Sequence, residues 1–237
     1  MTQSRNVTIN TAAGAFAGYL AKPAAEASSR PAVLLLPEIY NLNDWIKAVA
    51  DQYAAHGYLT LVPDLFWRQE AAAALPYTPE GQQRGRALGA GLSREDAVVD
   101  VLASVEWLRQ QGAVAVGAVG FCLGGELALL AAAESPRERA PVLDSAVAYY
   151  PTRMEHHLEA VARIAAPSLI HIGEKDYRTP PDMVTSLSSV LPATSELYVY
   201  PDADHGFGRF GHPPFHAPSA ELALTRTYTW LDSRTAR

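Results

Sequence analysis

Short apolar segments with the pattern of buried strands alternate with helical periodicities along almost the whole chain. Residues 32–36, for example, are apolar at every position, which is typical of a parallel strand covered by helices on both faces. The expected strands span residues 32–36, 59–62, 113–119, 145–149, 168–172 and 197–200, and the expected helices span residues 43–57, 93–112, 123–133, 154–164, 181–191 and 219–231. This alternation predicts one α/β domain over residues 1–237 with a mainly parallel sheet.

Two segments depart from the alternation. The first thirty residues alternate loosely around Val7, Ile9, Phe16 and Leu20 and carry the turn formers Gly14 and Gly18, which predicts a β-hairpin ahead of the main fold. Residues 67–92 show no clean period. We expect an irregular excursion or short helices there, of the kind that often covers a site.

Composition and charge restrict the cellular context. Of the 237 residues, 49% are hydrophobic and 19% charged, which is typical of a soluble globular domain. The net charge of −6 disfavours nucleic acid and anionic membranes as partners, and no apolar stretch reaches the length of about 18 residues that a membrane span needs. The chain start lacks a signal-peptide pattern, and a single cysteine favours a reducing compartment. We therefore expect a soluble cytoplasmic protein, as a monomer or small homo-oligomer, without nucleic-acid or membrane partners.

The sequence GFCLGG at residues 120–125 lies between an expected strand and an expected helix. A side chain at the tip of such a tight turn needs small neighbours, because the backbone doubles back, and Gly120 and Gly124 meet this requirement. The N–H groups at the helix start favour a thiolate and a developing oxyanion, with the backbone of Leu123 as one donor. We interpret Cys122 as a nucleophile for acyl transfer. The alternative is a buried structural cysteine at a glycine-rich turn.

A nucleophile of this type needs a base and an orienting acid, in the chain order nucleophile, acid, histidine. Asp176 and His205 each follow the carboxyl end of an expected strand, which is where sites assemble in open α/β sheets. Asp176 would hold His205 in the tautomer that accepts the thiol proton. The alternatives for the acid are Glu174, Asp202 and Asp204.

Five motifs in order resemble the dienelactone hydrolase family, a group of α/β-hydrolases with cysteine in place of the usual serine. They are PEIYN at 37–41, PDLFWRQ at 63–69, GFCLGG at 120–125, GEKD at 173–176, and HGF at 205–207 with Arg209 close behind. The resemblance covers most of the chain and implies the α/β-hydrolase fold, a mainly parallel central sheet with helices on both faces. It also implies a Cys122, Asp176 and His205 triad, hydrolysis of a carboxylated enol-lactone in chloroaromatic degradation, and no cofactor.

The resemblance implies roles for the first motif as well. Glu38 matches a glutamate that contacts the resting thiol, and substrate binding would release Glu38 so that His205 completes the deprotonation. The alternative for Glu38 is a helix-capping acid. The backbone N–H groups of Ile39 and Leu123 are the implied oxyanion donors.

Arginines are the implied ligands of a substrate carboxylate, since the planar guanidinium matches its geometry. Arg209 lies four residues after His205, as in the family, and Arg84 and Arg86 are candidates for a second contact. The tyrosine that neighbours this second arginine in the family is not found at the matching spacing, which leaves the identity of the substrate open.

Aromatic and histidine residues complete the set of expectations. The aromatic side chains that would line the pocket, with completion of the core as the alternative, are Tyr40, Trp67 and Phe207. His171 falls inside a strand pattern, and we expect a core residue with satisfied hydrogen bonds. Four further histidines, His156, His157, His212 and His216, lack partners at metal-binding spacing, so we expect no metal.

The favoured function is a cofactor-free hydrolase that opens a small-molecule lactone or a related ester through a Cys122 thioester, as a carboxymethylenebutenolidase does. One alternative is a general small-ester carboxylesterase. The alternative without turnover is a thiol-based redox or ligand sensor, although a chain with one cysteine has no second thiol to resolve an oxidised one.

Overall fold

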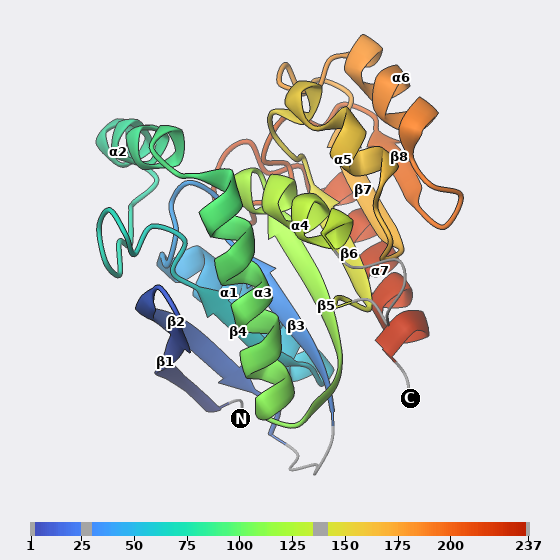
Figure 1. Ribbon diagram of the computed structural model, residues 1–237. Coiled ribbons are helices and arrows are strands. Elements are labelled where there is room, and N and C mark those ends of the chain that lie inside the picture. The colour runs from blue at the N-terminus through green and yellow to red at the C-terminus, as the bar shows by residue number, and fades with distance from the viewer. Residues whose placement is uncertain (1–2, 25–29, 135–141, 236–237) are drawn as a thin grey trace. The chain divides into compact units, whose positions relative to one another are not determined.

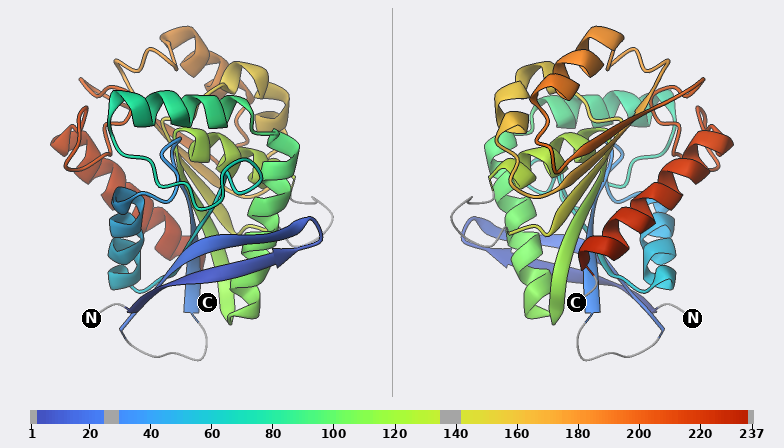
Figure 2. Two further views of the ribbon diagram at one scale, coloured as in Figure 1. Left: turned by 90° about the vertical axis from the view of Figure 1, so that its left-hand side faces the viewer. Right: turned by 90° about the vertical axis from the view of Figure 1, so that its right-hand side faces the viewer.

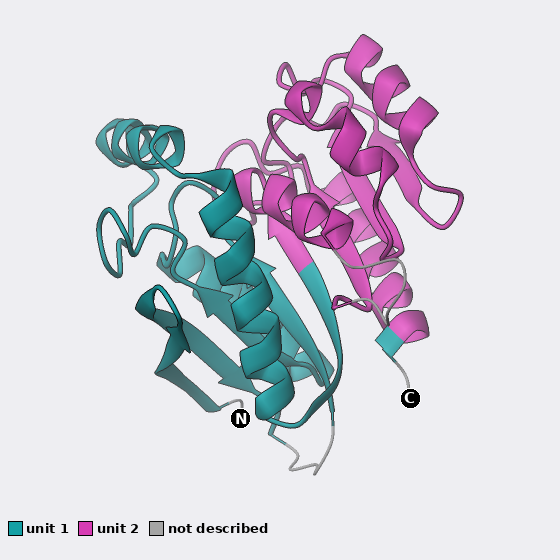
Figure 3. Ribbon diagram, in the orientation of Figure 1, with its two compact units in different colours: residues 1–118, 235–237 teal, residues 119–234 magenta. Residues whose placement is uncertain are grey.

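The computed structural model contains one eight-stranded sheet with the strand order β1-β2-β4-β3-β5-β6-β7-β8 (Figure 1). The structure describes residues 3–24, 30–134 and 142–235. Strand pairs β1/β2 and β2/β4 are antiparallel, whereas β3/β4, β6/β7 and β7/β8 are parallel. The predicted α/β class with a mainly parallel sheet is therefore confirmed. The chain divides into two compact units, residues 1–118 with 235–237 (unit 1) and residues 119–234 (unit 2) (Figure 3).

Unit 1 begins with the predicted hairpin and continues through three helices. Its strands are β1 (Gln3–Thr11), β2 (Gly14–Lys22), β3 (Arg30–Leu36), β4 (Leu59–Pro63) and the greater part of β5 (Ala113–Phe121), and its helices are α1 (Asp44–His56), α2 (Pro79–Ala90) and α3 (Arg94–Gln110). Helices α1 and α3 lie on opposite faces of the strands of this unit (Figure 2). This arrangement buries β3 and β4, which explains their uninterrupted apolar sequences.

The ends of α1 show how local sequence sets these boundaries. The side chain of Asn43 accepts a hydrogen bond from the backbone N–H of Ile46 at the first turn. At the other end, Gly57 has φ 117°, a left-handed conformation that costs glycine little, and its N–H bonds to carbonyls of the last turn. The helix therefore begins and ends where the sequence predicts.

Unit 2 carries the second half of the alternation. Its elements are α4 (Leu123–Ala133), β6 (Ser145–Tyr149), the 3₁₀-helix η1 (Met154–His156), α5 (Leu158–Ala162), β7 (Ser168–Gly173), α6 (Pro181–Val190), β8 (Glu196–Tyr200) and α7 (Ala217–Thr235). Helices α4 and α7 lie on opposite faces of the strands in this unit (Figures 1 and 2). Within the described part of the chain, no helix is long and apolar enough to cross a bilayer.

The structure confirms the short-helix alternative for residues 67–92 and corrects one other expectation about helices. The excursion at 67–92 contains the three-turn helix α2, which Thr78 caps and whose buried glycines obscured the period. Packing requires glycine at position 85, because a Cβ there would lie 2.4 Å from the carbonyl oxygen of Ile39. The single helix expected at 154–164 is interrupted at His157, whose φ of −127° is not helical.

The expectation for His171 is confirmed. Its Nδ1 lies 2.8 Å from the hydroxyl of Tyr200, and its Nε2 lies 3.1 Å from that of Thr227. Burial, assisted by the charge of Arg226, lowers the pKa of His171 to about 3. The ring is therefore neutral at physiological pH and serves as a hydrogen-bonded core group.

Candidate active site

Cys122 occupies the turn between β5 and α4 in a strained backbone conformation. Its φ of 55° and ψ of −114° are rare for a residue with a side chain. The turn is held because the Cys122 N–H donates to the carbonyl of Tyr149 at 3.0 Å and its own carbonyl accepts from Glu126 at 3.1 Å. The side chain is largely covered, with 8% of the residue exposed. Strain at one nucleophilic side chain is typical of a functional site.

The turn depends on the glycine two residues before Cys122. A Cβ placed on Gly120 would lie 2.0 Å from the carbonyl oxygen of Gly124 and 2.2 Å from its carbonyl carbon. These distances are far below any van der Waals contact, and the obstacle is backbone. The sequence-based requirement for a glycine at this position is confirmed.

The loops after β7 and β8 bring Asp176 and His205 together in unit 2. Nδ1 of His205 lies 2.9 Å from Oδ2 of Asp176. The Asp176 carboxylate is buried and is oriented by the backbone N–H of Arg178, which donates to Oδ1 at 2.9 Å. The two loops can approach this closely because residue 173 is a glycine. A Cβ at this position would lie 2.4 Å from the carbonyl oxygen of Ala203.

The other acids considered as partners of His205 have different contacts. Glu174 is exposed and accepts a hydrogen bond from the backbone of Asp202. Asp202 pairs with Lys175 at 2.7 Å on the surface. Asp204 accepts from the backbone N–H of His205 rather than from its ring. Asp176 is therefore the acid that contacts the His205 imidazole.

The electrostatic environment of His205 favours its protonated form. Burial lowers the pKa of His205, but the negative charge of the Cys122 sulfur, a hydrogen bond with Asp176 and a hydrogen bond with Cys122 outweigh it and raise the pKa to about 10. Because the pKa is raised, the contribution of His205 to stability is fully present below pH 6.5 and is lost as the pH rises through about 10. The arrangement suits a thiolate and imidazolium pair.

We expect the His205 ring to titrate near pH 10 in imidazole NMR spectra, with its signals assigned from a His205→Gln variant. The midpoint should fall in Cys122→Ala, because that change removes the charge that raises the pKa most. A wild-type midpoint at or below 6.5 would contradict this prediction and would instead indicate a neutral pair with a protonated resting thiol.

Sequence reasoning missed a buried carboxylate one turn after Cys122. Glu126 is fully buried in α4, and its Oε1 lies 3.0 Å from Nε2 of His157. Its Oε2 accepts a hydrogen bond from the hydroxyl of Thr152 at 3.2 Å, and Nε of Arg153 lies 3.7 Å from Oε1. These contacts connect the start of α4 to the segment after β6. The available signal was a single acidic residue in an otherwise apolar helix, since a buried charge requires partners.

In unit 1, Glu38 is buried directly after β3. Its Oε2 accepts a hydrogen bond from the hydroxyl of Tyr77 at 3.2 Å, and the Tyr77 ring packs against Tyr40 with centroids 4.3 Å apart. The N-cap of α1 is Asn43, so the helix-capping alternative for Glu38 is wrong. The carboxylate is thus held in the core of its unit rather than at a helix end.

A second buried contact joins the motifs at 37–41 and 63–69. The amide of Asn41 donates to Oδ1 of Asp64 at 2.6 Å, and the Asn41 side-chain oxygen accepts from the backbone of Leu65 at 3.0 Å. Burial raises the pKa of Asp64, although the hydrogen bond from Asn41 acts in the opposite direction. Together with the packing of α2 at Gly85, this contact fixes the backbone that carries Ile39.

The candidate arginines differ in their surroundings. Arg209 is partly exposed, and its guanidinium carbon would lie 3.2 Å from a Cβ on Gly206, the residue after His205. Arg84 forms an ion pair with Glu70, and Arg86 is exposed on α2. Only Arg209 is thus placed next to the candidate histidine within its unit.

The candidate aromatic residues contact other aromatic rings. Trp67 stacks on Phe16 with centroids 5.6 Å apart and donates from Nε1 to Asp100 at 2.8 Å. Phe207 is fully buried between Tyr150 and Tyr200. For both residues these contacts favour the alternative of a core role. Among the described residues, no cluster of three or more histidine, cysteine, aspartate or glutamate side chains is arranged to hold a metal ion.

The sheet, its helices and the strained turn at Cys122 define the class of protein, an α/β-hydrolase. An α/β-hydrolase from Penicillium sp. sh18 shares the fold, with a TM-score of 0.71 at 15% identity over 99% of this chain and 100% of that one. The profile of the dienelactone hydrolase family matches residues 16–235, and the chain belongs to this family.

Relatives with described activities agree with this assignment. The chain is 32% identical to a carboxymethylenebutenolidase from a Pseudomonas species, over 92% of this chain and 90% of the relative. It is 30% identical to carboxymethylenebutenolidase 1 of Cupriavidus pinatubonensis, over 92% of each. The crystal structure of a candidate dienelactone hydrolase from Klebsiella pneumoniae superposes with a TM-score of 0.85 at 25% identity, over 98% of each chain. The protein is thus a hydrolase of small lactones or carboxylic esters, class EC 3.1.1.

Proposed function

We propose that this protein hydrolyses a small carboxylated enol-lactone, the reaction of a carboxymethylenebutenolidase, with Cys122 as nucleophile, His205 as base and acid, and Asp176 as the orienting acid. The observation that carries the proposal is the 2.9 Å contact between Asp176 and His205, and the raised pKa of His205, to which Cys122 contributes, supports the third member. The names of the relatives support the substrate class. The family match runs through both units, which supports the prediction of a single domain.

Acylation begins when the Cys122 thiolate attacks the lactone carbonyl carbon and the carbonyl oxygen becomes an oxyanion. The backbone N–H groups of Leu123 and Ile39 are the proposed donors to that oxyanion. Collapse of this intermediate breaks the ring C–O bond, and the departing enol oxygen takes the proton from His205. The product of this half-reaction is a thioester on Cys122 with neutral His205.

Deacylation returns the protein to its starting state. Neutral His205 removes a proton from water, the resulting hydroxide attacks the thioester carbon, and the C–S bond then breaks. The acid product leaves as a carboxylate, and Cys122 and His205 again share one proton. Asp176 holds the imidazole in one orientation throughout, through the 2.9 Å contact with Nδ1.

Two residues are proposed to adapt this chemistry to a carboxylated substrate. Arg209 beside Gly206 would bind the substrate carboxylate with its planar guanidinium. Glu38, buried directly after β3, would contact the resting sulfur and move away from it when substrate arrives. Cytoplasmic location and a role in the degradation of chloroaromatic compounds remain predictions.

Steady-state kinetics with cis- and trans-dienelactone and with uncharged aryl esters test this proposal. We expect kcat/KM to favour the carboxylated lactones. Arg209→Ala should lower kcat/KM for them by about 10- to 100-fold, because one charge-assisted contact is lost, and should leave the aryl esters nearly unchanged.

The matched control is Arg163→Ala, which removes an exposed arginine from the same unit. A wild-type preference for neutral esters would contradict the proposal and would assign the protein as a general carboxylesterase.

A further inference from the structure

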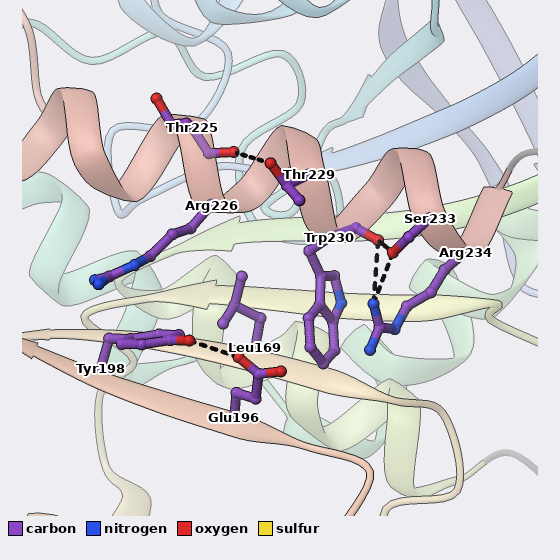
Figure 4. Close-up of a pocket in the computed structure, with 9 residues that line it drawn as sticks. All are labelled: Leu169, Glu196, Tyr198, Thr225, Arg226, Thr229, Trp230, Ser233 and Arg234. Carbon is purple, nitrogen blue, oxygen red and sulfur yellow. Dashed lines mark hydrogen bonds between the residues drawn. The ribbon is translucent and has the colours of Figure 1, made fainter.

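We propose a second binding site in unit 2, which takes a small planar monocarboxylate in a pocket beneath α7. The pocket has a volume of about 240 Å³ and lies between α7 and the first residues of β7 and β8 (Figure 4). This volume is below the range of about 300–1,000 Å³ that is usual for ligand sites, which restricts the ligand to the size of a single substituted ring. The inference does not depend on the proposed function.

The pocket is separate from the candidate active site. It is lined by Leu169, the second residue of β7, and Glu196, the first residue of β8, which are paired in the parallel register. Asp176 and His205 follow the carboxyl ends of the same two strands. The two sites therefore lie at opposite ends of β7 and β8.

A buried donor faces this pocket without an acceptor. Trp230 is 5% exposed, and its indole N–H has no hydrogen-bond partner among residues 3–24, 30–134 and 142–235. Figure 4 shows the indole projecting from α7 into the pocket. A buried donor without a partner destabilises the folded chain, so a ligand that brings an acceptor gains an interaction that the protein alone does not make.

Two guanidinium groups give the pocket its positive charge. The guanidinium carbon of Arg234 lies 3.2 Å from the ring centroid of Trp230, and that of Arg226 lies 3.8 Å from the ring centroid of Tyr198. Arg234 hydrogen-bonds to the hydroxyl of Ser233 at 2.9 Å, a neutral partner. In the described residues neither guanidinium forms an ion pair within 4.0 Å of a carboxylate, so both retain charge for an anion.

The remaining lining selects the type of anion. Glu196 supplies one negative charge, and its Oε2 accepts from the hydroxyl of Tyr198 at 2.7 Å, so the lining carries a net charge of one positive unit. Thr225 and Thr229 donate their hydroxyl hydrogens to carbonyls of α7 and have none left for a ligand. A monoanion fits this balance better than a dianion. Leu169 and the parts of the Tyr198 and Trp230 rings that the two guanidinium groups leave uncovered complement a flat apolar body, which completes the description of an aromatic carboxylate.

The test uses benzoate as the probe and the tryptophan indole N–H signals in ¹H–¹⁵N NMR spectra of the full chain. The chain has four tryptophans, and the signal lost in Trp230→Phe identifies Trp230. We expect benzoate to shift this signal downfield with saturation, and the neutral isostere benzamide and the small anion acetate to bind at least about tenfold more weakly. Arg234→Gln should weaken benzoate binding by about tenfold or more, whereas the matched Arg163→Gln should leave it unchanged.

Three results would overturn the proposal: an unshifted Trp230 signal, equal binding of benzamide or acetate, or unchanged binding in Arg234→Gln. If Trp230→Phe does not fold, backbone-linked assignment of the wild-type spectrum identifies the signal instead. Inhibition of hydrolysis by benzoate without a shift at Trp230 would place benzoate in the active site and would also overturn the proposal. None of these outcomes bears on whether Cys122 is the nucleophile.

Discussion

Replacement of Cys122 by alanine is expected to lower kcat/KM for lactone hydrolysis by about 10⁴-fold or more. The proposed reaction proceeds through a thioester, and alanine has no atom that can form it. What remains is the contribution of substrate binding and oxyanion stabilisation. Steady-state kinetics measures the loss, and mass spectrometry after rapid quenching of the wild-type reaction should detect an acyl adduct on the single cysteine.

The fold of the Cys122→Ala variant provides the control. Alanine at φ 55° bears the same backbone strain as cysteine, so the melting temperature should change little. Full turnover in Cys122→Ala would remove the nucleophile assignment. The sensor alternative would be favoured if the wild-type protein formed no acyl adduct, had no esterase activity and bound a ligand in a peroxide-dependent way.

The second large effect is expected on stability, from Gly120→Ala. The added methyl would lie 2.0 Å from the carbonyl oxygen of Gly124, and relief of the clash requires the turn between β5 and α4 to move. We expect a loss of more than about 4 kcal/mol in the free energy of unfolding, or failure to fold. For a chain of this size, such a loss lowers the melting temperature by about 8 °C or more, measurable by calorimetry.

Gly208→Ala is the matched control in the same unit. A Cβ on Gly208 meets its nearest neighbour, the ring of Tyr149, at 3.5 Å, which is an ordinary contact. The free energy of unfolding of this variant should lie within about 1 kcal/mol of the wild-type value. A Gly120→Ala protein as stable as Gly208→Ala would show that the turn is free to open, contrary to the strained geometry at Cys122.

Structural features that depend on residues close together in the sequence, such as helix ends and tight turns, were predictable from the sequence. Asn43 and Gly57 delimit α1 because a cap acts on backbone groups within one turn. The turn at Cys122 was predictable for the same reason, since the clash at Gly120 involves an atom four residues away. The positions of Asp176 and His205 followed from a topological rule, because the ends of parallel strands meet at one edge of the sheet.

Contacts between distant segments were decided by the tertiary structure. Gly85, one of the glycines that obscured α2, is needed because it packs against the backbone of Ile39, a requirement that helix propensity does not contain. The buried Glu126 contacts His157, 31 residues away, at the point where the next expected helix is interrupted. Likewise, the indole N–H of Trp230 belongs to a candidate binding site only because the fold places Arg234 and the start of β8 beside it. Periodicity in a sequence indicates which face of an element is buried, but the partner on that face depends on how the elements pack.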